Sequence, residues 1–299
     1  MEYSKPPKTL DEQIEIIKNR GLVIDDEEKL KKYLINISYY HLSAYFKSFQ
    51  HNDKFKSGTT LENVINLYEF DKKLRLLLLD VLERIEKSFK CSVIYNLAID
   101  HNNPHWYLDL DLYSSQENFD EFIEPLLEKN IKISKEVSIR HYYDKYSEPE
   151  YPPSWIALEV LTFGECVKLC RQLKRAEQNS FSRPFNIDRQ FLISWMHGLS
   201  VVRNICAHYA RIWNKNIALS LKLNHRIYGE FFNDSARAKL YNYLVVIQIM
   251  MCKINPTSSW VEKLENLVDE YQPYLPSMGF PGDWKERLEK ISQIKNDKQ

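Results

Sequence analysis

A short run of polar residues inside an apolar, helix-patterned segment carries the groups needed to cleave RNA. The run extends from His197 to Asn214 and includes Arg203, Asn204 and His208. Internal attack by a ribose 2′-hydroxyl needs a base for the hydroxyl proton, an acid for the leaving oxygen and a cation for the phosphate. Histidine can serve as acid or base near neutral pH, and arginine binds phosphate oxygens through a planar fork. The run therefore predicts phosphodiester cleavage in which His208 moves a proton, Arg203 stabilises the phosphate and Asn204 positions it.

The spacing of these groups predicts how they lie if the run forms one helix. Arg203 precedes His208 by five residues, which places the two side chains about 140° apart around the helix axis. Both can border one cleft without stacking on each other, and a second helix or a second subunit would complete the site. Four residues of the run share a single stripe at helical spacing: Ser200, Asn204, His208 and Arg211.

Two acidic residues distant in the sequence are candidates to support this site. Glu83 and Glu86 lie in a long apolar segment that we expect to form another helix of the same bundle. From there either carboxylate can orient His208 or pair with Arg203, while pairing with a neighbour on its own helix is the simpler interpretation. A histidine that only supports a helical core, beside surface arginines, would give the same sequence pattern. A catalytic role and a structural role for His208 therefore both stay open.

Charge is unevenly distributed along a chain whose formal net charge is zero. Residues 168–226 hold eleven Lys and Arg against two acids, whereas residues 107–150 hold eleven acids against five bases. An acid-poor block around the proposed site is what a phosphate-binding cleft requires. The residues that we expect to contact RNA are Arg171, Lys174, Arg175, Arg211, Asn214 and Lys215.

Four segments, in order, resemble the Abi family of bacterial abortive-infection proteins, in particular its AbiD/AbiF-like group within the HEPN superfamily of helical ribonucleases. The segment RNICAHYARIWN (203–214) is similar to the family's Arg-Asn-x-x-Ala-His run followed by Arg-(Leu/Ile)-Trp-Asn. The resemblance covers roughly residues 8 to 255. Its other segments are ISYYHLSAYFKSF (37–49), INLYEFDKKLRLLLLDVLERIEKSF (65–89) and PPSWIALEVLTFGECVKLCRQL (152–173).

The resemblance implies roles for individual residues and for partners. Arg203 and His208 match the family's Arg-x4-His catalytic pair, and Asn204 matches the polar position after the arginine. HEPN ribonucleases commonly form homodimers in which two motifs face one RNA cleft, and they need no metal or other cofactor. Members of the Abi group are toxins during phage infection, and relatives are restrained by a small structured RNA, so RNA is expected as substrate and as inhibitor. Many relatives have a second histidine where this chain has Tyr209, which leaves one imidazole per subunit.

Composition and patterning predict an all-α protein. Hydrophobic residues make up 44% of the chain and charged residues 27%, which is typical of a soluble globular protein, and glycine and proline are few. Apolar residues follow helical spacing nearly throughout. We therefore predict a HEPN-like helical bundle with additional N- and C-terminal helices. Its domains would be an Abi-like domain at residues 1–255 and a C-terminal helical extension at 256–299 packed on it.

Capping residues predict where individual helices begin. Each expected helix starts just after Ser, Thr or Asp, or where apolar residues resume helical spacing. It ends at Gly, at Pro or at a cluster of polar residues. The expected helices begin after Thr9, after Asp25 or Asp26 (residues 27–49), after the Thr59-x-x-Glu62 capping box (to about Ile99), after Ser114, after Ser154 (residues 155–175), near Asp188, at Ala236 (to Lys253) and after Ser259.

An aromatic cluster falls in the second of these helices. At helical spacing such residues usually pack in a core, and stacking on RNA bases is the alternative interpretation. The cluster comprises Tyr39, Tyr40, Tyr45, Phe46 and Phe49.

Other classes of protein fit the chain poorly. Its five cysteines, an odd number without a CxxC pair, indicate reduced thiols rather than a disulfide framework or a zinc site. The N-terminus lacks the apolar core of a signal peptide, and the most apolar run, LVVIQIMM (244–251), is too short to cross a bilayer. We expect a cytoplasmic protein without membrane partners. Without a convergent carboxylate set or a Gly-rich phosphate loop, the chain does not resemble metal-dependent nucleases or nucleotide kinases, so neither a metal nor another cofactor is expected.

Two functions are consistent with the sequence. The first is a metal-independent endoribonuclease toxin of an abortive-infection system that forms a cyclic phosphate product through the Arg-x4-His motif. The second is a non-catalytic module of the HEPN type that binds a structured RNA or a protein partner. Substitution of Arg203 and His208 by alanine distinguishes them, because cleavage depends on both side chains only in the first.

Overall fold

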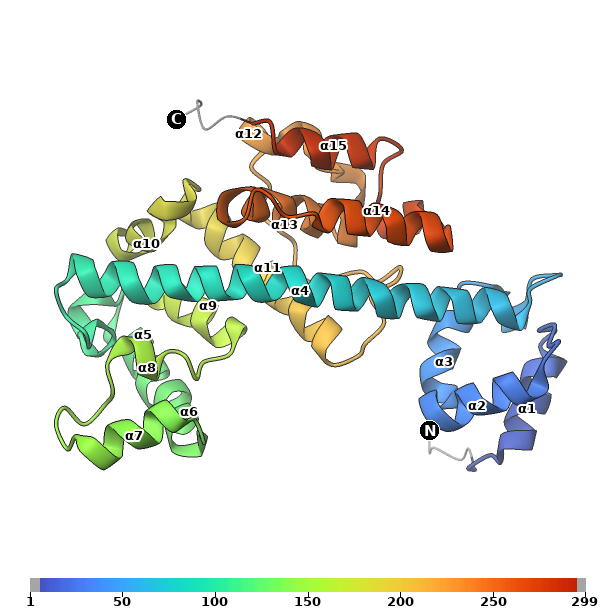
Figure 1. Ribbon diagram of the computed structural model, residues 1–299, viewed down its shortest axis with the longest axis horizontal. Helices are drawn as coiled ribbons and strands as arrows, with labels where there is room; N and C mark the ends of the chain where they lie inside the picture. The colour runs from blue at the N-terminus through green and yellow to red at the C-terminus, as the bar shows by residue number, and fades with distance from the viewer. Residues whose placement is uncertain (1–5, 295–299) are drawn as a thin grey trace. The chain divides into compact units, whose positions relative to one another are not determined.

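The computed structural model describes residues 6–294, apart from the side chains of residues 124–126, and is helical almost throughout (Figure 1). Within this part of the chain, the only strands are two that pair in a short hairpin. The prediction of an all-α fold is therefore confirmed.

The chain comprises two compact units, and the division between them falls inside the long helix α4 (Leu61–Asp100). Unit 1 contains the residues up to Leu76 together with Leu264–Pro273, and unit 2 contains Leu77–Lys263 and the residues from Tyr274 onward. The division at residue 255 stays a prediction. Residues 1–5 and 295–299 of the predicted domains lie outside the described part of the chain.

Unit 1 is built around three short helices that begin or end at clear capping residues. Thr9 and Glu12 form a capping box at the start of the first helix, and Asp26 caps the second, so both predicted starts are confirmed. The elements of this unit are α1 (Leu10–Asn19), α2 (Glu27–Ile37), α3 (Tyr39–Phe46), β1 (Gln50–His51), β2 (Lys54–Phe55) and the parts of α4 and α14 (Trp260–Tyr271) that fall within it.

The predicted single helix from residue 27 to 49 is wrong, because the chain breaks at Ser38. Ser38 has a φ of 71°, which ends α2, and its hydroxyl accepts a hydrogen bond from the backbone N–H of His41 to start α3. A serine in this backbone region is uncommon. Apolar spacing continues across the break, which is why the periodicity alone did not locate it.

The long helix α4 is capped by Thr60, one residue after the predicted cap Thr59. The Thr60 hydroxyl accepts from the Asn63 N–H, and the Asn63 side-chain oxygen accepts from the Thr60 N–H. Thr59 instead donates its hydroxyl to a backbone carbonyl, and Glu62 pairs with Lys29. The predicted Thr59–Glu62 box is therefore wrong, whereas the predicted end near Ile99 is confirmed by the end of α4 at Asp100.

Unit 2 holds the rest of α4 and the helices that surround it. Its α-helices are α5 (Gln116–Phe122), α6 (Lys129–Ile133), α7 (Val137–Lys145), α8 (Ser154–Ala157), α9 (Phe163–Gln172), α10 (Arg175–Ser182), α11 (Arg189–Ala207), α12 (His225–Tyr228), α13 (Leu240–Ile254) and α15 (Trp284–Ile291), with the first residues of α14. Turns of 3-10 or π-helix lie at Trp106–Leu108, Leu110–Leu112, Ile123–Glu128, Arg183–Phe185, Gly229–Phe231, Asp234–Ala236 and Leu275–Met278.

The predicted helix from residue 155 to 175 is also wrong, because three helices occupy this region. The short α8 stops at Ala157, and a capping box between Thr162 and Glu165 starts α9. The next helix, α10, begins at Arg175, where the predicted helix was expected to end. Two further starts differ slightly: Ser115 rather than Ser114 caps α5, and α13 begins at Leu240 rather than at 236.

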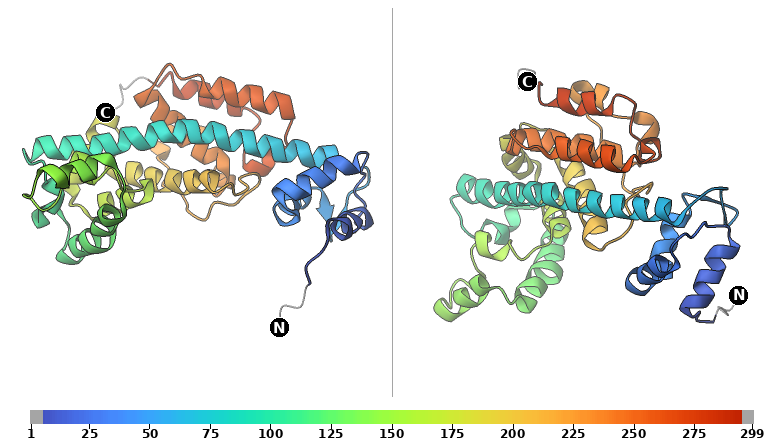
Figure 2. Two further views of the ribbon diagram at one scale, coloured as in Figure 1. Left: turned by 60° about the horizontal axis from the view of Figure 1, so that its bottom comes forward. Right: turned by 45° about the vertical axis from the view of Figure 1, so that its right-hand side comes forward.

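The core of unit 2 is organised around α13, in which every residue from Leu240 to Met251 is buried. This helix packs against α11 and α15, and α11 also packs against α9 (Figures 1 and 2). The loop after α11 is attached to that helix: the Trp195 indole donates to the Lys222 carbonyl, and the Lys222 N–H donates to the Ser194 hydroxyl. The same core therefore holds both α11 and the loop that follows it.

Gly198 on α11 allows this loop to pack closely. A Cβ at this position would overlap the Leu221 side chain and would lie 3.1 Å from the ring of Tyr243. We expect Gly198→Ala to lower the free energy of unfolding by about 1–3 kcal/mol, because the buried neighbours must move. Urea unfolding measures this, with Gly164→Ala on α9 as the control, since a Cβ there makes ordinary contact with Ser200. Equal effects of both substitutions would contradict this explanation.

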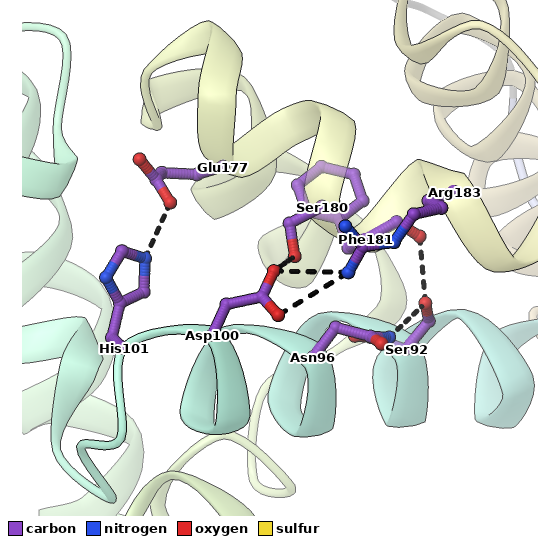
Figure 3. A network of polar contacts seen from close by, with 8 residues as sticks. All are labelled: Ser92, Asn96, Asp100, His101, Glu177, Ser180, Phe181 and Arg183. Carbon is purple, nitrogen blue, oxygen red and sulfur yellow. Dashed lines mark hydrogen bonds and ion pairs between the residues drawn. The ribbon is translucent and has the colours of Figure 1, made fainter.

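A polar network joins the end of α4 to α10 (Figure 3). The Ser180 hydroxyl donates to Asp100 at 2.6 Å and lowers the pKa of that carboxyl, together with the nearby Arg183 guanidinium. His101 Nε2 lies 2.7 Å from the Glu177 carboxylate, and the Ser92 hydroxyl donates to a backbone carbonyl of α10. These contacts fix the segment that leads into α11.

Candidate active site

Helix α11 carries the catalytic candidates at its C-terminal end. Asp188 caps its start by accepting from the Gln190 N–H, which confirms the predicted start. The helix ends at Ala207, so Arg203 and Asn204 lie in its last turns and His208 is its C-cap residue. Of the predicted stripe, Ser200 is buried and Arg211 lies beyond the helix, whereas Asn204 and His208 are exposed one turn apart.

The chain reverses immediately after His208 through a Schellman motif. Tyr209 adopts left-handed backbone with a φ of 57°. Its N–H donates to the Cys206 carbonyl at 3.2 Å, and the Ala210 N–H donates to the Ile205 carbonyl at 3.0 Å. A bulky residue is uncommon in this conformation, whereas histidine is among the residues that adopt it more often. The turn leaves the His208 side chain exposed at the end of the helix.

Arg203 is held by a carboxylate from α4. Its Nε lies 3.5 Å from Glu86 Oε2, and Glu86 Oε1 lies 3.3 Å from Lys90 Nζ. Lys90 also donates to the Leu161 carbonyl at 2.6 Å. The Glu86 side chain is only 13% exposed and that of Lys90 9%, while that of Arg203 is 37% exposed, so the anchor is shielded from water and the guanidinium reaches the surface.

This contact decides between the two acidic candidates. The pairing of Arg203 with a carboxylate across the bundle is confirmed for Glu86, whereas Glu83 pairs with Lys87 on its own helix at 2.9 Å. The sequence analysis did not single out Lys90, although its i,i+4 spacing from Glu86 is the signal that could have indicated this ion pair. Asn204 lies beside Arg203, whose Nη1 is 3.5 Å from the amide oxygen.

A second group of polar residues lies in the loop after the motif. Lys239, just before α13, donates to the side-chain oxygen of Asn214 at 2.7 Å. Burial and the nearby Arg211 guanidinium both lower the pKa of Lys239. Lys215 follows Asn214 directly, and Ile217 bonds through its N–H to the Ala238 carbonyl, which brings the two segments together. Arg211, Asn214, Lys215 and Lys239, hereafter the loop cluster, could bind a phosphate.

Lys239 is the member of the loop cluster that the sequence did not indicate, since it lies 25 positions from Asn214. We expect Lys239→Ala to weaken RNA binding and to reduce the salt dependence of log Kd by slightly less than one, as loss of about one phosphate contact predicts. Fluorescence anisotropy at several salt concentrations measures both. Arg237→Ala is the matched control because Arg237 is neutralised by Asp234 at 2.8 Å. An unchanged salt slope for Lys239→Ala would contradict a phosphate contact.

The other three predicted RNA contacts lie beside the middle and the start of α11. The Arg171 guanidinium approaches His197, and burial together with that cation lowers the pKa of His197. Lys174 and Arg175 are exposed at the start of α10, whose Gln178 accepts from Arg189 at the first residue of α11. A helix rises about 1.5 Å per residue, so the Arg189 contact lies roughly 22 Å along the axis from Asn204 and the His197 contact roughly 10 Å. The structure does not bring this group to His208.

The other chemical groups considered from the sequence do not form a site. Among residues 6–294, no three His, Cys, Asp or Glu side chains gather in a way that could hold a metal ion. Cys166 and Cys170 are both buried, and burial raises the pKa of the Cys170 thiol.

Among residues 6–294, no helix combines the length and the apolar character needed to cross a membrane.

The arrangement suits recognition and cleavage of a phosphodiester. An exposed imidazole, an amide and an anchored guanidinium share one helix end, and further cations lie in the loop that follows. A guanidinium held by a shielded carboxylate is preorganised to stabilise charge on a phosphate. One imidazole can act as the acid or as the base, and the complementary group must come from another source.

One protein-family model matches the part of the chain that contains these groups. Residues 32–214, more than half of the chain, match the family model described as Abi-like protein, and the match includes Arg203, Asn204 and His208. No curated protein and no solved structure matches the chain. The chain therefore belongs to the Abi-like protein family.

Proposed function

We propose that this chain is a metal-independent endoribonuclease of the HEPN superfamily, of the AbiD/AbiF-like group, and that it acts as a toxin in abortive-infection defence against phage. The observation that carries the proposal is the placement of Arg203 and His208 at one end of α11, with Arg203 anchored by Glu86. Membership of a family named for abortive infection supports the defence role.

The reaction begins with attack of a ribose 2′-oxygen on the adjacent phosphorus. The new 2′-oxygen to phosphorus bond forms as the bond from phosphorus to the 5′-oxygen breaks. A base accepts the 2′-hydroxyl proton, and an acid protonates the departing 5′-oxygen. The products are a 2′,3′-cyclic phosphate and a 5′-hydroxyl. Arg203 stabilises the non-bridging oxygens as their charge increases, and Asn204 positions the phosphate.

A homodimer would supply the second proton-transfer group. Each subunit contributes one imidazole, because the position after His208 is Tyr209. His208 is exposed at a helix end, where a second copy of the chain can approach it. In this arrangement one His208 acts as base and the other as acid on a single RNA strand.

The cationic residues would bind the flanking phosphates. Three members of the loop cluster closely follow His208, and Lys239 bonds to one of them, Asn214. The cluster therefore contacts the nucleotides next to the cleaved bond. Arg171, Lys174 and Arg175 contact phosphates farther along the strand. A structured RNA that occupies both groups without presenting a cleavable bond would act as an inhibitor.

Substrates with a single 2′-deoxy nucleotide test the mechanism. After the cleaved bond in an RNA oligonucleotide has been mapped, the hydroxyl next to that bond is removed in a second oligonucleotide. We expect cleavage to stop at that bond and to continue at other sites. Continued cleavage at the modified bond would exclude attack by the 2′-oxygen.

The alternative function is a non-catalytic module that binds a structured RNA or a protein partner. The single imidazole of each subunit is the observation that favours it, since in one in-line step a lone histidine cannot lie at both the attacking 2′-oxygen and the departing 5′-oxygen. In that case RNA is bound but left intact, and substitution of His208 alters the affinity alone.

A further inference from the structure

Two groups of residues away from the end of α11 have side chains suited to RNA contact. In the aromatic cluster of unit 1, the prediction of a core holds for the buried Tyr45 and Phe46, whereas Tyr40 is 88% exposed. The second group is Arg171 on α9 and His197 on α11, whose side chains contact each other. Only the second group is joined to the catalytic candidates by a single helix, because α11 carries both.

His197, Asn204 and His208 lie on one face of α11. Asn204 follows His197 by seven positions and His208 by eleven. At about 100° per residue, both later side chains lie within about 20° of the direction of His197 around the helix axis. Asn204 and His208 are exposed, and His197 and Val201, on the same face, are partly exposed. At about 1.5 Å per residue, this face extends roughly 16 Å from His197 to His208.

Arg171 reaches this face from α9. Its Nη1 lies 3.4 Å from Nδ1 of His197. A guanidinium only donates hydrogen bonds, so Nδ1 accepts and the proton of the neutral ring is on Nε2. Burial and the Arg171 cation both lower the pKa of His197, which favours the neutral ring that this contact needs. The imidazole therefore orients one N–H of the guanidinium and leaves its other N–H groups for an anion.

The charge of Arg171 differs from that of the nearest basic residue on the same helix. Lys168, one turn earlier on α9, lies 3.2 Å from the Glu121 carboxylate. Arg171 is exposed, and no carboxylate of residues 6–294 lies within 4.0 Å of its guanidinium. We call Arg171 and His197 the α9–α11 subsite. This subsite presents an oriented cation that its protein neighbours do not neutralise.

We propose that the α9–α11 subsite holds one phosphate of the RNA at a fixed distance from His208 and thereby sets which bond is cleaved. Arg171 binds the phosphate through its planar fork, and His197 is a positioning residue that acts through Arg171. The inference rests on the proposed function and deepens it, because it gives one expected RNA contact a defined place on the strand.

The distance defines the class of substrate. One strand of a duplex rises about 3.4 Å per nucleotide, so roughly 16 Å corresponds to about five stacked nucleotides, and to fewer in an extended strand. The preferred substrate is therefore an RNA that continues for several nucleotides on one side of the cleaved bond. A trinucleotide contains two adjacent phosphates and cannot occupy the catalytic position and the subsite together.

Cleavage of a long and a short RNA tests this distance. The long substrate has about 12 nucleotides, with the mapped cleavage site in the middle, and the short one is a trinucleotide with the same cleaved bond. We expect Arg171→Ala to raise KM for the long RNA by about ten-fold with little change in kcat, because the lost contact to a charged phosphate is equal in the ground and transition states. The kcat/KM for the trinucleotide should not change. Lys168→Ala is the matched control and should alter neither substrate, since Glu121 pairs with that lysine.

The role of His197 is tested by two substitutions of different chemistry. His197→Leu removes the acceptor and should raise KM for the long RNA by about three- to five-fold, the contribution of one hydrogen bond. His197→Asn keeps an acceptor near the position of Nδ1 and should preserve KM. Once Arg171 has been removed, His197→Leu should have no further effect, because the imidazole acts through that arginine. Urea unfolding of each variant identifies loss of folding.

Binding provides a measurement that does not depend on cleavage. The protein is the full chain with His208→Ala, and the probe is the long RNA labelled with fluorescein. Addition of Arg171→Ala should reduce the salt slope of log Kd by roughly 0.7, the value for one phosphate contact with a single strand. Addition of Lys168→Ala should leave the slope unchanged.

The outcomes separate the α9–α11 subsite from the ribonuclease. If wild type cleaves RNA and Arg171→Ala leaves KM for the long substrate unchanged, the subsite is wrong and the ribonuclease stands. Equal losses for the long RNA and the trinucleotide, or equal losses in Arg171→Ala and Lys168→Ala, also overturn the subsite. If wild type cuts no RNA but Arg171→Ala alone lowers the salt slope, the ribonuclease is wrong and the phosphate contact is supported.

Discussion

Replacement of His208 with alanine is expected to reduce RNA cleavage by about 10²–10⁴-fold, the contribution of a positioned proton-transfer group. The imidazole is exposed, and within the turn the backbone N–H of His208 bonds to the Asn204 carbonyl. The free energy of unfolding should therefore change by no more than about 0.5 kcal/mol. RNA binding should also be largely retained, since the cations of the loop cluster are unaltered. Cleavage rates, urea unfolding and anisotropy measure the three properties.

His141→Ala is the matched control, because His141 is an exposed histidine on α7 of the same unit. It should leave cleavage unchanged. If His208→Ala and wild type cut RNA at the same rate, the imidazole has no catalytic role and the proposed mechanism is wrong. If the His208 variant loses folding stability as well as activity, the residue is structural.

The second large effect is expected at the anchored guanidinium. Arg203→Ala should reduce cleavage by about 10²–10³-fold, because stabilisation of the phosphate charge is lost. Glu86→Gln should reduce it less, by about ten-fold, since the guanidinium remains but its anchor is weakened. Once Arg203 has been removed, Glu86→Gln should have little further effect on the cleavage rate, because the carboxylate acts through that arginine.

A double-mutant cycle of Arg203→Ala and Glu86→Gln measures this coupling. Glu83→Gln is the control, since Glu83 lies on the same helix but pairs with Lys87 at the surface. Additive losses for Arg203 and Glu86 would mean that Glu86 contributes to cleavage by another route. A loss in Glu83→Gln equal to that in Glu86→Gln would point to a general effect of charge on α4.

The elements that followed from local sequence signals were the most predictable. Thr9 and Asp188 cap helices where expected, because each cap involves residues only two or three positions apart. The all-α class followed from helical spacing over most of the chain. The breaks at Ser38 and after Ala157 were missed, because apolar spacing continues through both and neither contains Gly or Pro.

The candidate site likewise contains some residues that the sequence could predict and others that only the folded structure brings together. Arg203, Asn204 and His208 were identifiable because they lie within one short run at the end of α11. Glu86 was one of two possibilities, and only the packing of α4 against α11 selected it. Lys239 joins the site through a contact between distant segments, and its own neighbours in the sequence give no signal of that role. Lys90 pairs with Glu86 one helical turn away, and only the contact of Glu86 with Arg203 connects that pair to the site.

The most direct test of the ribonuclease mechanism is end-group analysis of RNA incubated with purified wild-type protein or His208→Ala in excess EDTA. Wild type should produce fragments with 2′,3′-cyclic phosphate and 5′-hydroxyl ends, and the His208 variant should leave the RNA intact. Cleavage only after a divalent metal is added back, or fragments with 5′-phosphate ends, would contradict metal-independent attack by the 2′-oxygen.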